Sequence, residues 1–322
     1  MAINTRTVPA HDADTRLDRW LRRYYPQLTQ GALQKMLRTG QIRVDGKRAE
    51  ANTRLLGGQE IRIPPMPEGQ APKALPKPVN ERDAKDIQRL VIYRDDAVIA
   101  LDKPHGLAVQ GGPGIAKHID GLLDALRFDS EERPRLVHRL DRDTSGVLVL
   151  ARTGAAAAKL AAAFRSRAAE KTYWAVVVGR PTGFEGRIDL ALSKQGGPKG
   201  ERVAEDKEEG AHAITYWRLV DSAQRRASFV ELTPRTGRTH QLRVHCTEGL
   251  KCPILGDGKY GGAGAFMEGL PNMLHLHARA LRLPHPDGGT LELAAPLPPH
   301  MDETFLFLGF DRPKPPPCRR LR

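Results

Sequence analysis

The 322-residue sequence has few of the features that would place a protein outside the cell or in a membrane. It contains only three cysteines, Cys246, Cys252 and Cys318, which are too few for a disulfide framework. The sequence has no run of about 18 apolar residues, the length needed to cross a bilayer. Its first residues also lack the apolar stretch of a secretory signal. These absences predict a cytoplasmic protein in reducing surroundings.

Aromatic residues are also scarce, at 5% of the chain, whereas basic residues are abundant. The scarcity disfavours binding through many stacked bases. Lysine and arginine together number 51 against 38 acidic residues, which gives a net charge of +13 and suggests a polyanionic partner. With 40% hydrophobic residues, the length suits one large domain and one small domain.

Residues 14–63 have the pattern of a small domain. Apolar residues at helical spacing indicate a first helix: Leu17, Trp20, Leu21 and Tyr24. Asp14 or Thr15 is expected to be its N-cap. A second helix follows, which Thr29 caps and Gly40 ends. The turn Asp45-Gly46 then predicts a β-hairpin, and "GGQEIRIP" predicts another short strand.

Residues 64–82 contain six prolines and predict a semi-extended linker. From residue 83 to 311, strands and helices alternate without regular βαβ units, which predicts an α+β domain. Helices are expected over 117–128 and 154–173, and "HQLRVHC" at 240–246 is read as a strand. A mobile charged loop is expected over 193–213, and a basic, disordered tail over 312–322.

The run "HRLDRDTSG" at 138–146 places Asp141 and Asp143 among arginines, just before a purely apolar strand. A neighbouring arginine favours the charged form of an aspartate, whereas burial opposes it. Either the run is a salt-bridged loop, or one carboxylate is kept ionised in a dry pocket, where it serves as a nucleophile or base. The local pattern supports both interpretations.

Two kinds of metal site are disfavoured by residue spacing. In a D-x-D-x-T phosphatase loop the threonine would follow one place later than Thr144 does, and the intervening Arg142 suits magnesium poorly. A zinc site made from His240, His245, Cys246 and Cys252 would lack the CxxC spacing. On a strand, moreover, the neighbours 245 and 246 would project to opposite sides.

The run "HRLDRDTSG" resembles the signature motif of the RluA-type RNA pseudouridine synthases. Four further stretches resemble that family and occur in its order: "DDAVIALDKPHGLAVQGG", "EKTYWAVVVG", "RTGRTHQLRVHCTEGLKCPILGDGKYG" and "LHLHARALRLPHP". The likeness spans residues 88–310 and is greatest to the RluC-type branch, which modifies large-subunit rRNA. It implies a mixed, largely antiparallel catalytic sheet and the isomerisation of a flipped-out uridine to pseudouridine. Neither a cofactor nor a metal is expected.

The resemblance implies roles for individual residues. Asp141 matches the catalytic aspartate, Tyr173 the tyrosine that packs against the target base, and Arg243 the basic residue that pairs with the aspartate. Arg139 and Thr144 match positions that shape the catalytic loop beside the RNA, whereas Asp143 lies at a variable position. The third motif implies RNA contacts for four consecutive residues, Arg238, Thr239, His240 and Gln241. Three histidines, His138, His245 and His277, are read as structural or RNA-facing.

Residues 14–63 resemble the S-four-like RNA-binding domain that is shared with a small-subunit ribosomal protein. In that family a basic helix face meets structured RNA, and the matching residues here are Arg16, Arg19, Arg22, Lys35, Arg38 and Arg43. We therefore expect a monomeric enzyme whose partner is rRNA or a pre-ribosomal particle, and neither DNA nor a membrane. Two alternatives stay open: a synthase for other rRNA or tRNA uridines, and a catalytically silent RNA-binding factor in ribosome assembly.

Overall fold

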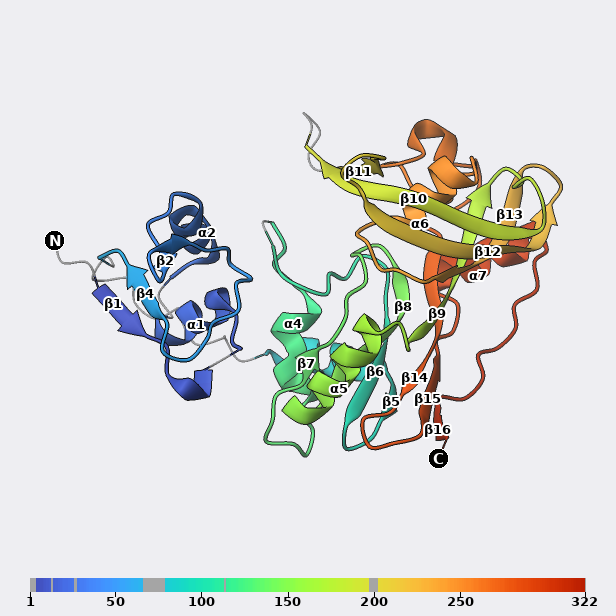
Figure 1. Ribbon diagram of the computed structural model, residues 1–322. Helices are drawn as coiled ribbons and strands as arrows, with labels where there is room; N and C mark the ends of the chain where they lie inside the picture. The colour runs from blue at the N-terminus through green and yellow to red at the C-terminus, as the bar shows by residue number, and fades with distance from the viewer. Residues whose placement is uncertain are drawn as a thin grey trace. The chain divides into compact units, whose positions relative to one another are not determined.

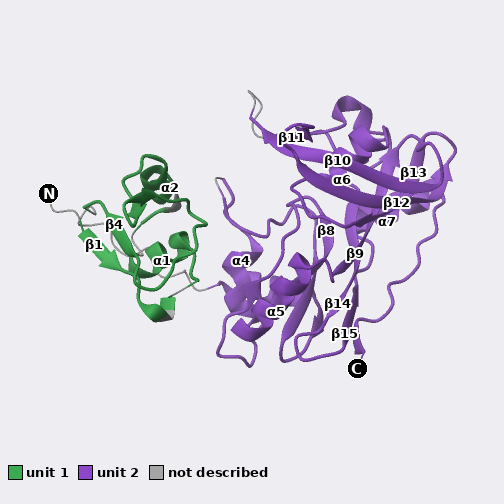
Figure 2. Ribbon diagram, viewed as in Figure 1, with its two compact units in different colours: residues 1–78 green, residues 79–322 purple. Residues whose placement is uncertain are grey.

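The computed structural model describes residues 4–12, 14–25, 28–65, 79–112, 114–196 and 202–321. The chain divides into two compact units, residues 1–78 and 79–322 (Figure 2). Each unit has its own sheet and its own core. Among the described residues, no helix combines the length and apolar character that crossing a membrane requires.

The first unit combines two helices with a four-stranded antiparallel sheet of order β1-β4-β2-β3. Its elements are β1 (Asn4–Thr7), the 3-10 turn η1 (Ala10–Asp12), α1 (Leu17–Tyr24), α2 (Gln30–Arg38), β2 (Arg43–Val44), β3 (Lys47–Arg48) and β4 (Glu60–Ile63). The predicted cap of α2 is confirmed, because the Thr29 hydroxyl accepts a hydrogen bond from the Ala32 N–H at 3.2 Å. The predicted hairpin is confirmed as well: Asp45 and Gly46, between β2 and β3, both have positive φ.

Two details of this unit differ from the predictions. Helix α1 begins after Arg16, which makes no capping hydrogen bond through its side chain, so neither Asp14 nor Thr15 is the N-cap. Strand β1 lies before the predicted start of the domain at residue 14 and pairs with β4 over its whole length. Its four side chains are all exposed, and the segment therefore lacks the apolar alternation by which a strand is recognised.

The second unit is an α+β domain built on a twelve-stranded sheet. Its strands are β5 (Val91–Arg94), β6 (Val98–Lys103), β7 (Arg135–Leu136), β8 (Ser145–Ala151), β9 (Glu170–Val178), β10 (Glu185–Gln195), β11 (Arg202–Glu205), β12 (Ala211–Ala223), β13 (Ala227–Pro234), β14 (Leu276–Pro284), β15 (Thr290–Ala294) and β16 (Arg319–Leu321). Its helical elements are α3 (Glu81–Arg89), α4 (Ile119–Leu122), η2 (Leu123–Leu126), α5 (Gly154–Arg165), α6 (Gln241–Val244), the π-helical turn η3 (His245–Gly249), η4 (Gly262–Ala265) and α7 (Pro299–Leu308).

The main path of the sheet follows the order β11-β10-β12-β13-β9-β14-β8-β6-β5. All neighbours on this path are antiparallel except β14 and β8, which are parallel and share two residue pairs. The predicted mixed, largely antiparallel sheet is thus confirmed. Strands β9 and β14 run between the two halves of the sheet and connect them (Figure 1).

Strand β8 is the most deeply enclosed strand of the unit, with all seven residues buried. One of its faces packs with Leu160 of α5, and the other packs with the apolar residues of α4 and η2. A strand that is buried on both faces has a fixed position, so the loop that precedes it, 138–144, is held at a defined place. That loop carries Asp141.

The segment 240–246 was predicted as a strand and is helical instead, forming α6 and the start of η3. All residues from Gln241 to Cys246 are buried. Leu242 and Cys246 pack into one core cluster, whereas Val244 packs into another. Polar and apolar residues alternate over 241–246 as in a half-buried strand, but all six are buried, so the alternation does not mark a solvent-facing side here.

Other boundaries also differ from the predictions. The linker prediction falls mostly on residues 66–78, which lie outside the described residues, and its last two residues begin α3. The segment 117–128 forms two short turns, α4 and η2, and α5 ends at Arg165. Within the expected charged loop, 202–205 form β11 against β10. The tail is not disordered at 319–321, because β16 pairs with the free edge of β15.

Candidate active site

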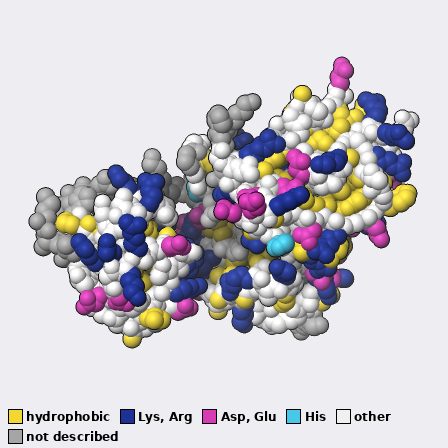
Figure 3. Space-filling model, turned by 45° about the horizontal axis from the view of Figure 1, so that its top comes forward, with side chains coloured by type: hydrophobic (Ala, Val, Ile, Leu, Met, Phe, Trp, Pro, Cys, Tyr) yellow, Lys and Arg dark blue, Asp and Glu magenta, His cyan; other side chains and the backbone are white. Residues whose placement is uncertain are grey.

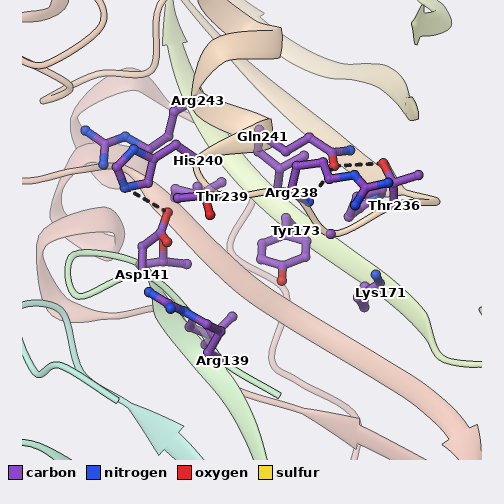
Figure 4. A pocket seen from close by; sticks show the side chains of 16 residues that line it. Arg139, Asp141, Lys171, Tyr173, Thr236, Arg238, Thr239, His240, Gln241 and Arg243 are labelled. Carbon is purple, nitrogen blue, oxygen red and sulfur yellow. Dashed lines mark hydrogen bonds and ion pairs between the residues drawn. The ribbon is translucent and has the colours of Figure 1, made fainter. Parts of the chain in front are cut away.

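One pocket of the second unit contains many of the residues singled out by the sequence. Four segments line it: the loop before β8, the start of β9, the connection from β13 into α6, and the first residue of β14, Leu276 (Figure 4). Asp141 is the only acid among the described lining residues, and it shares the pocket with Tyr173 and four cationic side chains, Arg139, Lys171, Arg238 and Arg243. The pocket therefore presents one carboxylate in strongly basic surroundings.

The loop that carries Asp141 is fixed from its first residue. His138 accepts a hydrogen bond from the Val149 N–H of β8 through Nε2 at 2.8 Å, and its ring stacks on Phe164 of α5. Burial lowers the pKa of His138 to about 3, so the imidazole is neutral and remains a hydrogen-bond acceptor. The Thr144 N–H then donates to the Asp141 carbonyl at 3.2 Å and closes the turn.

The end of the motif joins the loop to the two-pair contact between β8 and β14. The Ser145 hydroxyl and His277 Nδ1 lie 2.9 Å apart in the core. Gly146 has φ +106°, and a Cβ at this position would lie 2.2 Å from the Ala278 carbonyl oxygen. The close approach of β14 therefore requires a glycine at position 146.

Lys103 anchors the loop from the other side, and it was not singled out by the sequence analysis. Its fully buried ammonium donates to the carbonyls of Pro104, Leu107 and Arg142 at 2.8–2.9 Å. Burial lowers the pKa of Lys103 to about 7, although Asp143 and Asp141 oppose this shift. Since three carbonyl acceptors require three N–H donors, the geometry favours the charged form.

Tyr173 lies on β9 and forms one wall of the pocket (Figure 4). Its ring packs against two core clusters of the second unit. Burial, and secondarily the charge of Asp141, raise the pKa of the phenol above its ordinary value. The hydroxyl therefore stays protonated at neutral pH, and the ring offers an apolar face with one polar end.

Arg243 lines the pocket, but its predicted ion pair with Asp141 is not what the structure shows. Its guanidinium binds Asp257 through two hydrogen bonds of 2.8 and 2.6 Å, and both side chains are buried. Burial opposes the charge of Arg243, yet Asp257, and to a lesser extent Asp141, hold its pKa above the ordinary value. A buried cation needs a partner at contact distance. Asp257 is that partner, whereas Asp141 acts on Arg243 only electrostatically, without contact.

The described basic side chain that lies within ion-pair distance of Asp141 is His240. Its Nε2 is 3.9 Å from Asp141 Oδ2 (Figure 4), and its Nδ1 is 2.7 Å from the Tyr260 hydroxyl. Burial lowers the pKa of His240, whereas Asp141 acts in the opposite direction. The backbone of His240 is left-handed, with φ 51°, a conformation uncommon outside glycine that often marks functional sites.

Gln241 has no free polar atom for the predicted RNA contact. Its carbonyl accepts from the Thr236 hydroxyl and the Arg238 N–H, and its amide donates to the Ile214 carbonyl and the Thr215 hydroxyl. The side chain is buried. Gln241 thus shapes the loop 236–240, and this is a correction to the predicted role. The neighbouring Arg238 is exposed, and Thr239 is half-buried.

The remaining predicted residues differ in accessibility. Arg139 is exposed at the pocket rim, whereas Thr144 is buried beneath it. Lys171, Asp257 and Tyr260 were not singled out by the sequence analysis. Lys171 lies two residues before Tyr173, which places both on the same face of β9. Asp257 and Tyr260 belong to the quoted third motif, but nothing in a local pattern indicates that they contact residues 14–20 positions away.

In the first unit, one surface cleft is lined by Arg16, Arg38 and Arg48 and also by the acids Asp18 and Glu50. Arg16 is paired with Asp18 at 2.7 Å, and the half-buried Arg43 donates to the carbonyls of Gly40 and Gly46. The other four predicted basic residues are exposed: Arg19, Arg22, Lys35 and Arg38. Figure 3 shows basic side chains, in dark blue, spread over one face of this unit. The surface of the unit is thus suited to a polyanion.

Metal-binding groups of three or more His, Cys, Asp or Glu side chains do not occur in the part of the chain that the structure describes. Cys246 and Cys252 are buried free thiols, and burial raises the pKa of both. A raised pKa disfavours the thiolate form that a zinc ligand requires.

Comparison with known proteins agrees with this geometry. Residues 97–248 match the family described as RNA pseudouridylate synthase, and residues 15–61 match the S4 domain. The ribosomal large subunit pseudouridine synthase C of Rickettsia felis is 38% identical over 299 residues, which cover 91% of this chain and 96% of the relative. The mitochondrial RNA pseudouridine synthase 4 of Arabidopsis thaliana is 35% identical over 90% of this chain and 78% of its own.

A solved structure is similar as well. Human RNA Pseudouridylate Synthase Domain Containing 4 superposes with a TM-score of 0.60 at 30% identity and covers 72% of this chain and 97% of its own. The residues that match the synthase family include Asp141, Tyr173 and Arg243. The chain belongs to the RluA family of RNA pseudouridine synthases, with an S4 domain at its N-terminal end and with RluC-type enzymes among its relatives.

Proposed function

We propose that this pseudouridine synthase modifies uridines of large-subunit rRNA and that Asp141 is its catalytic carboxylate. The observation that carries the proposal is the pocket itself, in which Asp141 is the only described acid and faces Tyr173 and basic side chains. The isomerisation requires one carboxylate that acts as nucleophile or base, and Asp141 supplies it.

The reaction rearranges one nucleotide without adding or removing atoms overall. The bond from N1 of the base to C1′ of the ribose breaks, the base rotates, and a bond from C5 to C1′ forms. The C5 proton leaves, and N1 takes up a proton. Asp141 serves either as the nucleophile at C1′ or as the base for the 2′ proton, and the nearby cations stabilise negative charge on the detached base.

Access to the pocket implies base flipping. A uridine inside a helical stack cannot bring its C1′ against a recessed carboxylate, so the nucleotide must leave the stack. The Tyr173 ring is placed to pack on the extruded base, and the exposed Arg139 and Arg238 at the pocket rim are placed to bind the flanking phosphates.

The choice of rRNA rests on two supports. The relatives of Rickettsia and of Escherichia coli are named ribosomal large subunit pseudouridine synthase C, and the first unit carries exposed basic side chains on an S4 domain. We propose that residues 14–63 bind RNA while residues 83–311 perform the chemistry. A monomer suffices for this division of labour.

Two adjacent aspartates provide the test of Asp141. Asp141→Asn keeps the shape of the side chain and removes its charge, so it should abolish pseudouridine formation on rRNA while RNA affinity stays within a few-fold. Asp143→Asn is the matched control, because Asp143 pairs with the exposed Arg142 at 3.0 Å and lies outside the pocket lining. Product formation by the Asp141→Asn enzyme at the parental rate would refute the proposal.

The RNA target requires a separate experiment. Pseudouridines should be mapped across rRNA and tRNA in cells with and without the gene. Loss of sites in large-subunit rRNA is the expected result, and loss of sites in other rRNA or in tRNA would favour the alternative target. An unchanged map, together with retained rRNA binding, would favour a catalytically silent assembly factor.

A further inference from the structure

We propose that His240 is a positioning residue that holds the Asp141 carboxylate through an Nε2–H donor, and that Tyr260 sets the tautomer that makes this possible. The proposal deepens the function proposed above and rests on the assignment of Asp141. It concerns His240, which lines the pocket, and Tyr260, whose hydroxyl lies 2.7 Å from His240 Nδ1.

The hydrogen bonds of Tyr260 determine where its proton points. Its buried oxygen accepts from the Val203 N–H of β11 at 3.2 Å. The hydroxyl proton therefore needs an acceptor of its own, and His240 Nδ1 lies 2.7 Å away. Burial raises the pKa of the Tyr260 phenol, so the proton stays on the oxygen at neutral pH. Tyr260 is then the donor, and His240 Nδ1 is the acceptor.

This arrangement fixes the state of the imidazole. Burial lowers the pKa of His240, and a neutral ring that accepts at Nδ1 must carry its proton at Nε2. The Nε2–H faces Asp141 Oδ2 at 3.9 Å (Figure 4). Catalytic hydrogen bonds are often long in the absence of substrate and shorten when the substrate is bound, so a small closure completes this bond.

The surroundings of Tyr260 keep its ring in place. The guanidinium carbons of Arg243 and Arg202 lie 5.0 and 5.1 Å from the ring centroid, and Lys259 lies 5.9 Å from it. Charged groups facing His240 are Asp141 and Asp257, which favour its protonation, and Arg243 and Lys259, which oppose it. The left-handed backbone of His240 is the cost of aiming its ring between Tyr260 and Asp141.

Two amide substitutions distinguish positioning from a merely structural role. In His240→Gln the amide reaches the place of Nε2 and still donates to Asp141. In His240→Asn the amide reaches only the place of Nδ1, and the donor is absent. The single-turnover rate at saturating RNA should stay within about 5-fold of the parental rate for the Gln variant and fall about 10- to 100-fold for the Asn variant. The RNA dissociation constant should change little in either.

A structural role predicts the opposite ranking, because asparagine tolerates positive φ better than glutamine does. His212→Gln and His212→Asn, at an exposed histidine of β12, serve as controls and should keep the parental rate. Tyr260→Phe should lower the single-turnover rate about 10-fold, because the His240 ring is no longer held in the tautomer with its proton on Nε2. RNA binding should not weaken.

The outcomes separate this proposal from the one it rests on. Equal rates for the Gln and Asn variants, whether high or low, would overturn the role of His240, and so would a faster Asn variant. A parental rate in Tyr260→Phe would overturn the role of Tyr260. Activity of Asp141→Asn would instead overturn the assignment of Asp141 and, with it, this inference.

Discussion

At the scale of single residues, the buried pair Arg243–Asp257 joins the core to the pocket that contains Asp141. Both side chains are buried, and each is the other's contact partner. Removing one member leaves an uncompensated charge in the core, at a cost of about 3–5 kcal/mol. A drop in activity in a single Arg243 variant is therefore ambiguous, since it also follows from a failure to fold.

We predict that Arg243→Met lowers the free energy of unfolding by about 3–5 kcal/mol and that adding Asp257→Leu restores part of it, because the core is then uncharged although the Tyr260 N–H loses Asp257 as its acceptor. Activity should return with stability only if the guanidinium serves the fold alone. If Arg243 also acts on Asp141 through its field, the double variant should be stable and slow. Urea denaturation and single-turnover rates, measured on the same samples, decide between the two outcomes.

Two buried histidines, His245 and His277, differ in whether their ring nitrogens have hydrogen-bond partners. The described residues offer no hydrogen-bond partner to either ring nitrogen of His245, whereas His277 is bonded to Ser145. An unpaired buried polar group costs about 1–3 kcal/mol. His245→Leu is therefore expected to stabilise the protein at neutral pH, and His277→Leu to destabilise it. Thermal melts of both variants check the signs, and a decrease in stability in His245→Leu would contradict the first.

At the scale of elements, the contact between β8 and β14 depends on one glycine. A Cβ at Gly146 would meet the Ala278 carbonyl at 2.2 Å, and φ is +106°. Gly146→Ala should prevent the pairing of the two strands and leave little folded protein. Gly183→Ala is a matched control, since φ is also positive there but nothing lies within 4 Å of the added atom. The control should be destabilised by only about 1–2 kcal/mol. Comparable destabilisation in both would show that close packing is not the cause.

At the scale of the whole molecule, burial keeps several histidines neutral. It lowers the pKa of His138 and His277 to about 3, and of His245, His275 and His300 to about 4. Between the ordinary value of 6.5 and about pH 4, the unfolded chain binds protons that the folded chain does not. Stability is therefore greatest above pH 6.5 and falls with decreasing pH, by about 1.4 kcal/mol per pH unit for each such histidine.

This dependence can be measured as the urea midpoint at pH 7.5, 6.5 and 5.5, with tryptophan fluorescence as the signal. The midpoint should fall steadily below pH 6.5. His245→Leu removes one of the five groups, so the free energy of unfolding, which is the midpoint multiplied by m, should depend on pH less steeply by about 1.4 kcal/mol per pH unit. A midpoint that is constant down to pH 5.5 would contradict the assignment of neutral, buried imidazoles.

RNA affinity also belongs to the whole molecule, since it combines the two units. The exposed residues Arg19, Arg22, Lys35 and Arg38 are expected to neutralise phosphates, and removing each of these charges should reduce the salt slope of binding by about 0.7 for single-stranded RNA. Replacing all four by glutamine should raise KM and leave the single-turnover rate at saturating RNA unchanged. Arg319→Gln is a comparison, because Arg319 pairs with Glu292 at 2.9 Å. Equal salt slopes in the two variants would show that the first unit does not bind RNA electrostatically.

The sequence by itself determined the features that depend on neighbouring residues. The Thr29 cap, the Asp45-Gly46 turn, the apolar face of α1 and the buried run of β8 follow from local spacing and backbone preference. The site-bearing motifs belong to this group too, since "HRLDRDTSG" and "KTY" are contiguous. Each of these features depends on residues only a few positions apart, so the sequence alone is enough to predict it.

Only the tertiary structure decided which distant groups meet. It paired Arg243 with Asp257 in place of Asp141, satisfied the polar atoms of Gln241 inside the protein, and brought Lys103 under the loop that carries Asp141. It also made 240–246 helical, although polar and apolar residues alternate there as in a strand. Buried charges and polar atoms take whichever partner the packed chain brings within hydrogen-bond distance, and that choice is made by contacts between segments far apart in sequence.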